Sequence, residues 1–384
     1  MPVVLDNPFV YGEIVPRAAF IDREVELDRL VEDLADGQKV FLISPRRYGK
    51  SSLVRQALDI LSRRRLATVD VTVSSFSSYV AFLEGYARAL IALESRTGRA
   101  TSWLRELFRG VTPEVRVEAG THAGVSVSFP AVRTARDVAR LAEEVFTLPA
   151  RIAERLDRRV VIALDEFQAV AAFNGGSVEQ ALRAAVQQQR QVGYVFAGSE
   201  PSLMEQMIGP KRPFFKAGPV MRLGRIPADY FAAALDDRFK RSGLTGEAGL
   251  GAAIVDLGGN LPYDVQRLAH ETWDDVNAVR RKTVGLDDLH ATLHRLLSEQ
   301  DTLFEAMWQR LTLAQRATLR AVVLEHGVEI LSADVRTRHR LGGPSSVQAS
   351  LAALVRDDLI AREDEVRYTV VDSLLREWVA RKTF

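Results

Sequence analysis

Residues 44–52, SPRRYGKSS, have the types and spacing of a loop that binds a polyphosphate. Gly49, Lys50 and Ser51 match the end of the pattern G-x-x-x-x-G-K-[ST]. In that pattern backbone N–H groups surround phosphate oxygens, the lysine reaches the terminal phosphates and the hydroxyl binds magnesium. Ser44 replaces the first glycine, so a basic surface loop that contains Gly-Lys-Ser by chance is the alternative. The candidate nucleotide-binding residues are Pro45, Arg46, Arg47, Tyr48, Gly49, Lys50, Ser51 and Ser52.

Asp165 and Glu166 form an acidic pair directly after the apolar run from Val160 to Leu164. Such a run is typical of a buried parallel strand, and ligands of doubly wound sheets bind where these strands end. Asp165 can hold the magnesium that Ser51 also binds, and Glu166 can polarise the attacking water. A helix N-cap, the alternative, would need only one aspartate. Together with the loop at residues 44–52, the pair indicates ATP hydrolysis.

Ser199 follows another short apolar run, at residues 193–197, and is a candidate sensor of the γ-phosphate. It is equally suited to cap a helix that begins near Ser202. Farther upstream, Phe20 and Arg23 precede a helical apolar stripe for which Asp22 is a plausible N-cap. The segment either packs and caps that helix or abuts the base of a nucleotide.

The strands that must position these residues are expected at residues 39–43, 67–73, 160–164, 193–197 and 220–223. A hairpin at residues 114–129 reads as an insert. From residue 228 the strand signals disappear and helices take over, with a Gly-Gly-Asn-Leu-Pro break at residues 258–262 where a hinge or a nucleotide contact would lie. We expect three domains: an ATPase core at 1–225 with an insert near 98–133, a helical lid at 226–298 and a winged helix at 299–384. Residues 6–15 should form an arm on the domain that follows them.

The winged helix is predicted from three helices followed by a hairpin. The helices are expected at 312–326, from Ser332 to residue 340, and from Pro344 onward, and the strands at 359–362 and 366–370. Ser346 and Gln348 on the third helix, with Arg340 before it, are the candidate contacts to duplex DNA. A winged helix that contacts only proteins is the alternative.

Composition limits the remaining classes of function. The 384 residues carry a net charge of +1, so any nucleic-acid surface must be local. The chain has no cysteine and six histidines without paired spacing, which argues against disulfides, thiolate chemistry and a zinc site. No apolar run approaches the roughly 20 residues of a membrane span, and the N-terminus does not read as a signal peptide. We therefore expect a cytoplasmic protein.

Taken together, these motifs resemble the archaeal-type ATPases of the STAND and AAA+ classes of P-loop protein. The matching segments are FIDREVEL at 20–27, SPRRYGKSSL at 44–53, VVIALDEFQ at 160–168, FAGSEPSLM at 196–204, GGNLP at 258–262 and the terminal winged helix.

The resemblance implies a five-stranded parallel sheet in which the strand before Ser199 lies between those of the P-loop and of Asp165. It also implies that Lys50 contacts phosphates, Ser51 and Asp165 serve Mg²⁺, Glu166 activates water and Ser199 acts as the first sensor. Pro262 would contact the nucleotide. For an arginine finger, Arg212 and Arg222 are both candidates.

The sequence therefore predicts an ATP-hydrolysing switch whose nucleotide state controls DNA binding through the winged helix. The alternative is a signalling switch that hydrolyses ATP slowly and acts on a protein partner or on its own oligomeric state. A nucleotide-binding protein without turnover is the third reading.

Overall fold

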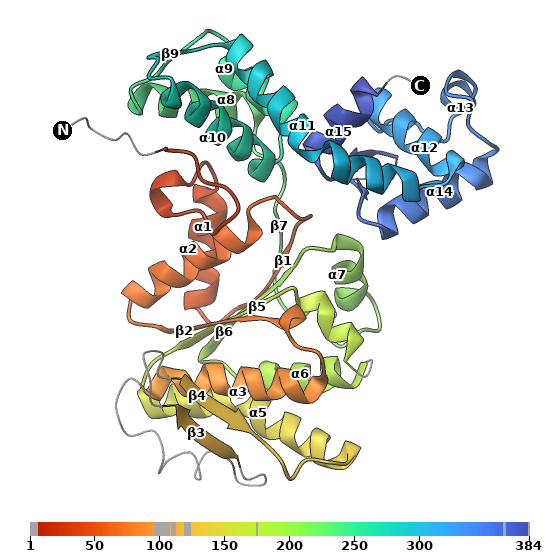
Figure 1. Cartoon of the computed structure of the whole chain (residues 1–384). Helices are drawn as coiled ribbons and strands as arrows, with labels where there is room; N and C mark the ends of the chain where they lie inside the picture. Colours follow the sequence, from red (N-terminus) through yellow and green to blue (C-terminus); the bar gives the residue numbers. More distant parts are fainter. Residues whose placement is uncertain are drawn as a thin grey trace. The chain divides into compact units, whose positions relative to one another are not determined.

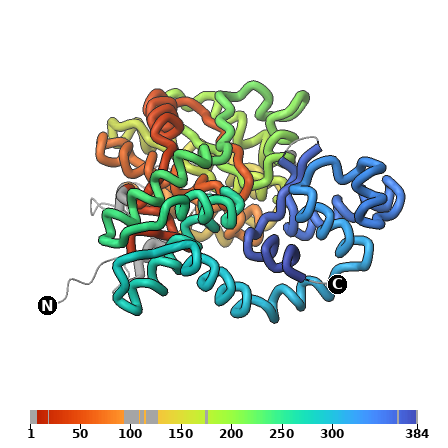
Figure 2. Tube along the Cα trace, turned by 90° about the horizontal axis from the view of Figure 1, so that it is seen from above, coloured from red at the N-terminus to blue at the C-terminus, as the bar shows by residue number. Residues whose placement is uncertain are grey.

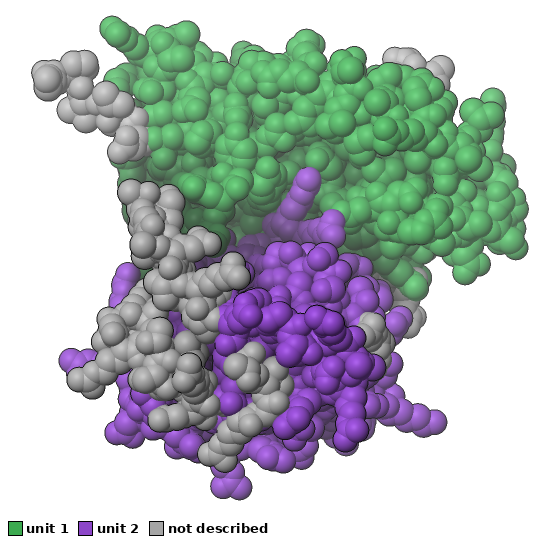
Figure 3. Space-filling model, turned by 60° about the horizontal axis from the view of Figure 1, so that its bottom comes forward, with its two compact units in different colours: residues 1–22, 225–384 green, residues 23–224 purple. Residues whose placement is uncertain are grey.

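The structure is a computed structural model, and it describes residues 7–95, 108, 113–118, 124–173, 176–363 and 366–382. The chain forms two compact units (Figure 3). Unit 2 is residues 23–224, and unit 1 combines residues 1–22 with 225–384. Each unit has its own apolar core, because the two clusters of buried side chains fall within the two units.

A five-stranded parallel sheet forms the centre of unit 2. Its strands are β1 (Lys39–Ile43), β2 (Ala67–Thr72), β5 (Val160–Asp165), β6 (Val192–Gly198) and β7 (Val220–Arg222). Their order is β2-β5-β6-β1-β7, and every neighbouring pair is parallel. The predicted fold is confirmed, including the position of the strand before Ser199 between those of Asp165 and of the P-loop.

Helices cover both faces of this sheet (Figure 1). They are α1 (Glu24–Ala35), α2 (Lys50–Arg63), α3 (Tyr79–Ser95), α5 (Ala135–Leu156), α6 (Gly176–Gln188) and α7 (Pro201–Ile208), with short 3-10 segments η2 (Val73–Ser75) and η3 (Phe167–Ala172). α1 and α2 lie on one face, and α3, α5 and α6 on the other. The predicted hairpin is a separate antiparallel pair, β3 (Glu114–Glu118) and β4 (Gly124–Ser128), and its turn lies outside the described residues.

Unit 1 contains the predicted helical lid. Its helices are α8 (Ala228–Arg241), α9 (Leu250–Leu257), α10 (Pro262–Ala278) and α11 (Leu286–Arg310). A two-residue parallel pair, β8 (Thr245–Gly246) with β9 (Thr283–Val284), interrupts the run of helices that was expected. The lid boundary predicted at residue 298 lies inside α11, which continues unbroken toward the winged helix (Figure 2).

The winged helix has the predicted elements and one more. α12 (Leu313–Leu324), α13 (Ala333–Arg338) and α14 (Pro344–Arg356) precede the hairpin of β10 (Ile360–Arg362) and β11 (Tyr368–Val370). Ser332 caps α13, since its hydroxyl accepts from the Val335 N–H at 3.2 Å. α15 (Ser373–Arg381) was not predicted and packs against α11 and α12.

Two expectations about the N-terminal region were wrong. The arm does not belong to the ATPase core: a 3-10 turn, η1 (Arg17–Ala19), follows it, and Phe9 is fully buried in the core of unit 1, with its ring 4.6 Å from that of Phe239. Tyr11 also donates to Glu271 on α10. Asp22 is not the N-cap of α1. That position belongs to Arg23, which has φ +80° and no side-chain cap bond.

Within the described residues, we find no helix with the length and apolar character needed to span a bilayer.

Candidate active site

Three strand ends bring the predicted site residues to one edge of the sheet. Ile43, the last residue of β1, is opposite Gly198 of β6, and Leu164 of β5 is opposite Phe196. All three strands are parallel, so the segments that follow them leave the sheet on the same side. The phosphate loop, Ser199 and the acidic pair are thus neighbours despite their distance in sequence.

The backbone of the loop suits a phosphate site. Gly49 is the N-cap of α2 with φ +85°, a conformation that side-chain-bearing residues rarely adopt, and a Cβ built there meets no atom within 4 Å. No side chain caps α2 among the described residues. The first N–H groups of a helix have no partner within it, which is why helix N-termini of this kind suit phosphate oxygens.

The backbone conformation of Ser44 explains why the first glycine of the motif is not needed here. Its φ is not positive, so the backbone at this position does not need glycine. Its N–H donates to the Gly198 carbonyl at 3.3 Å, and the residue is only 1% exposed. The loop is therefore anchored to β6 from its first residue.

Lys50 and Ser51 meet the acidic pair. The Lys50 ammonium contacts Asp165 Oδ1 and lies 3.6 Å from Glu166 Oε1. Ser51 Oγ donates to Asp165 Oδ2 at 2.8 Å. Lys50 is only 5% exposed, and burial strengthens its attraction to both carboxylates. A cation, a hydroxyl and two carboxylates thus converge where the phosphates of a nucleotide would lie.

Ser199 is held beside the second carboxylate. Its hydroxyl donates to Glu166 Oε2 at 2.5 Å, and the residue is 5% exposed. The helix-capping alternative is wrong, because α7 begins at Pro201 and Glu200 occupies its N-cap position.

Three further polar residues near the acidic pair were missed from the sequence. Gln168 contacts Glu166 and Ser199, and Glu200 lies at the edge of the same cluster. Gln168 was recognisable as a polar residue in the apolar segment after the acidic pair. Asp70 near the end of β2 was recognisable from its place on a parallel strand. Burial and the charge of Asp165 raise the pKa of Asp70, whereas Arg55 and Lys50 lower it.

Ser51 and Asp165 fit a magnesium ion that is shared with a nucleotide. Their contacting atoms are a hydroxyl and a carboxylate oxygen, the ligand types that Mg²⁺ combines with substrate phosphates and waters. In the part of the chain that the structure describes, no cluster of three or more His, Cys, Asp or Glu side chains could hold a metal alone. A metal at this edge would therefore take its remaining ligands from phosphate and water.

Comparison with known proteins identifies the fold. Residues 302–381 match the family model of a probable winged helix domain. The structure resembles a Walker-type ATPase of Pyrococcus abyssi, with a TM-score of 0.62 and 16% identity over 97% of this chain and 99% of that one. The Aeropyrum pernix ORC1 protein in complex with DNA gives a TM-score of 0.54 and 15% identity over 96% of this chain and 94% of that one. The chain has the fold of these two proteins.

The Aeropyrum pernix ORC2 protein supports the same assignment, with a TM-score of 0.54 and 14% identity over 97% of this chain and 96% of that one. A search of curated proteins found no significant sequence match. At these identities the structural similarities establish the fold alone. The activity has to be argued from the site itself.

The two arginine-finger candidates differ in their surroundings. Arg212 Nη2 donates to Glu179 Oε1 at 2.9 Å, and the Glu179 side chain is 1% exposed. Burial raises the pKa of Glu179, and Arg212 lowers it. Arg222 instead forms an exposed 3.2 Å pair with Glu205. Arg222 is the better candidate, since exposed pairs are weak and readily exchanged.

Three further residues predicted to contact the nucleotide, Phe20, Arg23 and Pro262, divide between the two units. Arg23 of unit 2 is 5% exposed and donates to Glu26 at 2.9 Å and to the Gly224 carbonyl, which favours the packing role. Phe20 and Pro262 belong to unit 1. The Phe20 carbonyl accepts from Arg238 at 3.0 Å, and Pro262 begins α10. Their contact with a nucleotide remains a prediction.

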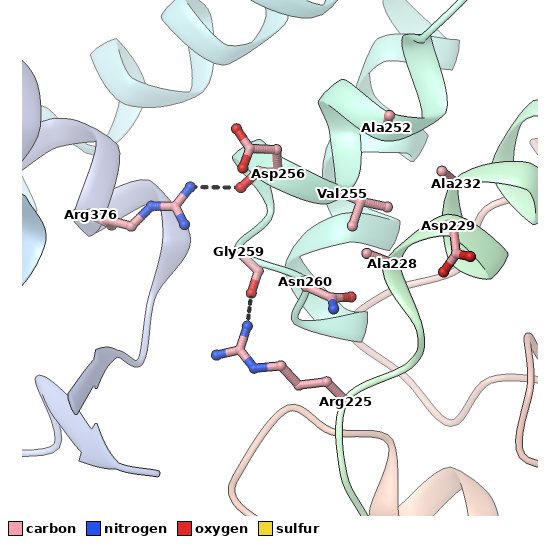
Figure 4. A pocket seen from close by; sticks show the side chains of 10 residues that line it. All are labelled: Arg225, Ala228, Asp229, Ala232, Ala252, Val255, Asp256, Gly259, Asn260 and Arg376. Atoms are coloured by element: carbon pink, nitrogen blue, oxygen red, sulfur yellow. Dashed lines mark hydrogen bonds between the residues drawn. The ribbon is translucent and has the colours of Figure 1, made fainter. Parts of the chain in front are cut away.

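Unit 1 has a hollow of its own beside the Gly-Gly-Asn turn (Figure 4). The cavity is about 340 Å³, and two arginines border it. Arg225 Nη1 donates to the Gly259 carbonyl, and Arg376 Nη2 donates to the Asp256 carbonyl at 2.8 Å. The arginines thus satisfy carbonyl groups at the end of α9, as basic side chains commonly do there.

The candidate DNA contacts are all exposed. Arg340 lies in the turn after α13 with φ +52°, and Ser346 and Gln348 lie in the first turns of α14. The exposed face of α14 continues with Ala349, Ala352, Val355 and Arg356. Arg356, the basic residue of this helix, is 3.4 Å from Asp357.

Proposed function

We propose that this protein binds ATP with Mg²⁺ and hydrolyses it at the edge of the sheet formed by β1, β5 and β6. The observation that carries the proposal is the convergence of Lys50 and Ser51 on Asp165 and Glu166. Each of these residue types has a distinct task in phosphoryl transfer, which depends mainly on positioning and charge stabilisation. A basic loop without a ligand would not need two carboxylates placed against it.

Lys50 and the first N–H groups of α2 would bind the β- and γ-phosphates. Ser51 and Asp165 would hold Mg²⁺, which neutralises negative charge on the phosphates when it is bound. Glu166 would orient the attacking water and accept its proton through Oε1, since Oε2 is already bonded to Ser199. Ser199 would connect this base to the γ-phosphate side of the site.

The test of this proposal is a magnesium-dependent phosphate-release assay on wild type and Lys50→Ala. We expect the variant to lose ATP binding by at least about tenfold, because a charged hydrogen bond to phosphate is removed from a buried position. Arg63→Ala, at the far end of α2, is the control and should bind ATP normally. Tight ATP binding by Lys50→Ala would contradict the phosphate assignment.

We further propose that the nucleotide state controls how the winged helix holds duplex DNA. The fold supports this output. So do the exposed side chains of Arg340, which precedes α14, and of Ser346 and Gln348, which lie in its first turns. Gln348 has an amide suited to adenine, and Arg340 has the charge suited to phosphate.

A protein partner is the second candidate, because the winged helix is not basic. Residues 299–384 contain 12 basic and 13 acidic residues, a net charge of −1. The tip of the wing carries Glu363 beside Asp364 and Glu365 in the sequence, whereas a DNA-binding wing is usually cationic. Exposed Val355 and Val366 add apolar surface to the same domain.

Salt dependence separates the two outputs. If DNA is the ligand, affinity for a mixed-sequence duplex should fall steeply between low and moderate salt. Arg340→Ala should then weaken binding and reduce the salt slope by about one. Absence of duplex binding at low salt, together with an ATP-dependent change in oligomeric state, would favour the protein partner.

A further inference from the structure

We propose that Gln168 is a positioning residue that fixes the Glu166 carboxylate for its work on water. The inference rests on the proposed ATPase function, and it assigns a role to a side chain that the P-loop motifs do not include. Gln168 is the second residue of η3, just beyond the acidic pair, and is only 5% exposed.

Gln168 faces oxygen atoms that need a donor. Its Nε2 is 2.6 Å from Glu166 Oε2, 3.3 Å from Ser199 Oγ and 3.4 Å from Glu200 Oε1. Ionised carboxylates only accept hydrogen bonds, so the NH₂ group and not the carbonyl must point toward them. The Ser199 hydroxyl gives its own proton to Glu166, which leaves its oxygen free to accept from Gln168.

The surrounding backbone holds Gln168 in this position. Gly198, at the end of β6, packs against it: a Cβ added to that glycine would come within 2.9 Å of Gln168 Oε1 and would also collide with Met204. Gln168 Oε1 is buried and has no hydrogen-bond partner. Burying an amide oxygen without a hydrogen-bond partner costs folding free energy. We infer that this cost is offset by the N–H bonds to Glu166 and Ser199.

The two carboxylate oxygens of Glu166 therefore have different roles. Oε2 receives two donors, from Ser199 and Gln168, and these fix the plane of the carboxylate. Oε1 remains as the oxygen that faces Lys50, at 3.6 Å. A base held in one orientation keeps its water in line with the phosphorus, and small misplacements of such a group are expensive in rate.

The experiment measures kcat and ATP affinity separately for wild type, Gln168→Leu and Gln168→Glu. For Gln168→Leu we expect kcat to fall by about 10- to 100-fold, while affinity for a non-hydrolysable ATP analogue stays within about twofold. Gln168→Glu replaces the donating amide with a carboxylate that only accepts, so its kcat should fall at least as far.

Gln189→Leu is the matched control. Gln189 is also buried, at 4% exposure, and also hydrogen-bonded, but it precedes β6 at the opposite end of the strand from Ser199. This variant should lower the melting temperature but keep kcat within about twofold of wild type. If Gln168→Leu does not fold, the kcat of Gln168→Glu decides the question.

The outcomes separate the inference from the proposed function. If Glu166→Gln abolishes hydrolysis but the Gln168 variants keep the wild-type kcat, the positioning role is wrong and the ATPase assignment stands. If wild type releases no phosphate, or Glu166→Gln releases it normally, the ATPase assignment itself fails. The positioning role further predicts that Gln168→Leu has no effect in a Glu166→Gln background, since both changes act through one carboxylate.

Discussion

The residues of the proposed active site are linked by direct contacts. Glu166 is contacted by Ser199, by Gln168 and by Lys50, which come from three separate segments of unit 2. Lys50 also contacts Asp165, so the cation proposed to bind phosphate and the carboxylate proposed to bind the metal share a hydrogen bond. Substitutions within such a cluster are not additive, and each should be measured in combination with the others.

Arg212 and Arg222 should respond differently to replacement by alanine. Arg212→Ala leaves the buried Glu179 without its cation, and we expect a loss of about 1 to 3 kcal/mol of stability, less than for a fully buried pair because Arg212 is 43% exposed. Arg222→Ala removes only a surface pair and should barely change stability. Thermal melts of both variants give the comparison.

The rate of ATP hydrolysis should respond in the opposite way, with the larger loss in Arg222→Ala. If Arg222 acts as an arginine finger, Arg222→Ala lowers ATP hydrolysis at a protein concentration that permits self-association, while its melting temperature stays near wild type. An Arg222→Ala variant with normal turnover, alongside a folded Arg212→Ala variant with impaired turnover, would assign the role to Arg212 instead.

At the scale of elements, the central strands were predictable because β1, β5 and β6 are almost completely buried. The apolar runs before Asp165 and Ser199 are typical of such strands, and the polar residues that follow them were the candidate site residues. The loop was predicted despite Ser44, and its φ shows why the missing glycine does not matter.

Other elements escaped prediction for physical reasons. The β8–β9 pair has two residues in each strand, too few for a periodic signal. The arm at residues 7–15 has no periodicity, so its burial of Phe9 in unit 1 depends on tertiary contacts. Gln168 was missed because its role arises only when β5 and β6 lie side by side.

Arg225 connects two separate elements of unit 1. It is the first residue after the crossing from unit 2, and its guanidinium contacts the Gly259 carbonyl, Glu363 and Thr369. It therefore joins the lid turn to the wing hairpin. Arginine suits this place because its planar fork offers several donors at fixed angles.

Arg225→Lys should not replace the arginine. One ammonium cannot reach all three partners, so we expect a loss of about 1 to 2 kcal/mol and faster amide exchange in the Gly259 turn and in β10 and β11. Hydrogen exchange measured by mass spectrometry tests this. Arg241→Lys, at an exposed pair with Asp237 on α8, is the control. Equal exchange in both variants would show that Arg225 does not join the two elements.

At the scale of the whole molecule, the proposed chemistry and the proposed output are in different units. The acidic pair and the P-loop belong to unit 2, and the lid and winged helix belong to unit 1. The chain passes between the units twice, at residues 22–23 and 224–225. Arg23 donates to the Gly224 carbonyl, so these two crossings are adjacent.

The central claim is that Glu166 activates water for an ATP held by Lys50, Ser51 and Asp165. A single-turnover measurement tests it most directly, with Mg²⁺ present at saturation and Glu166→Gln in excess over ATP. The account predicts that the variant binds ATP as tightly as wild type but hydrolyses it at least about 100-fold more slowly, because its general base is gone. Hydrolysis by Glu166→Gln at the wild-type rate would contradict the account.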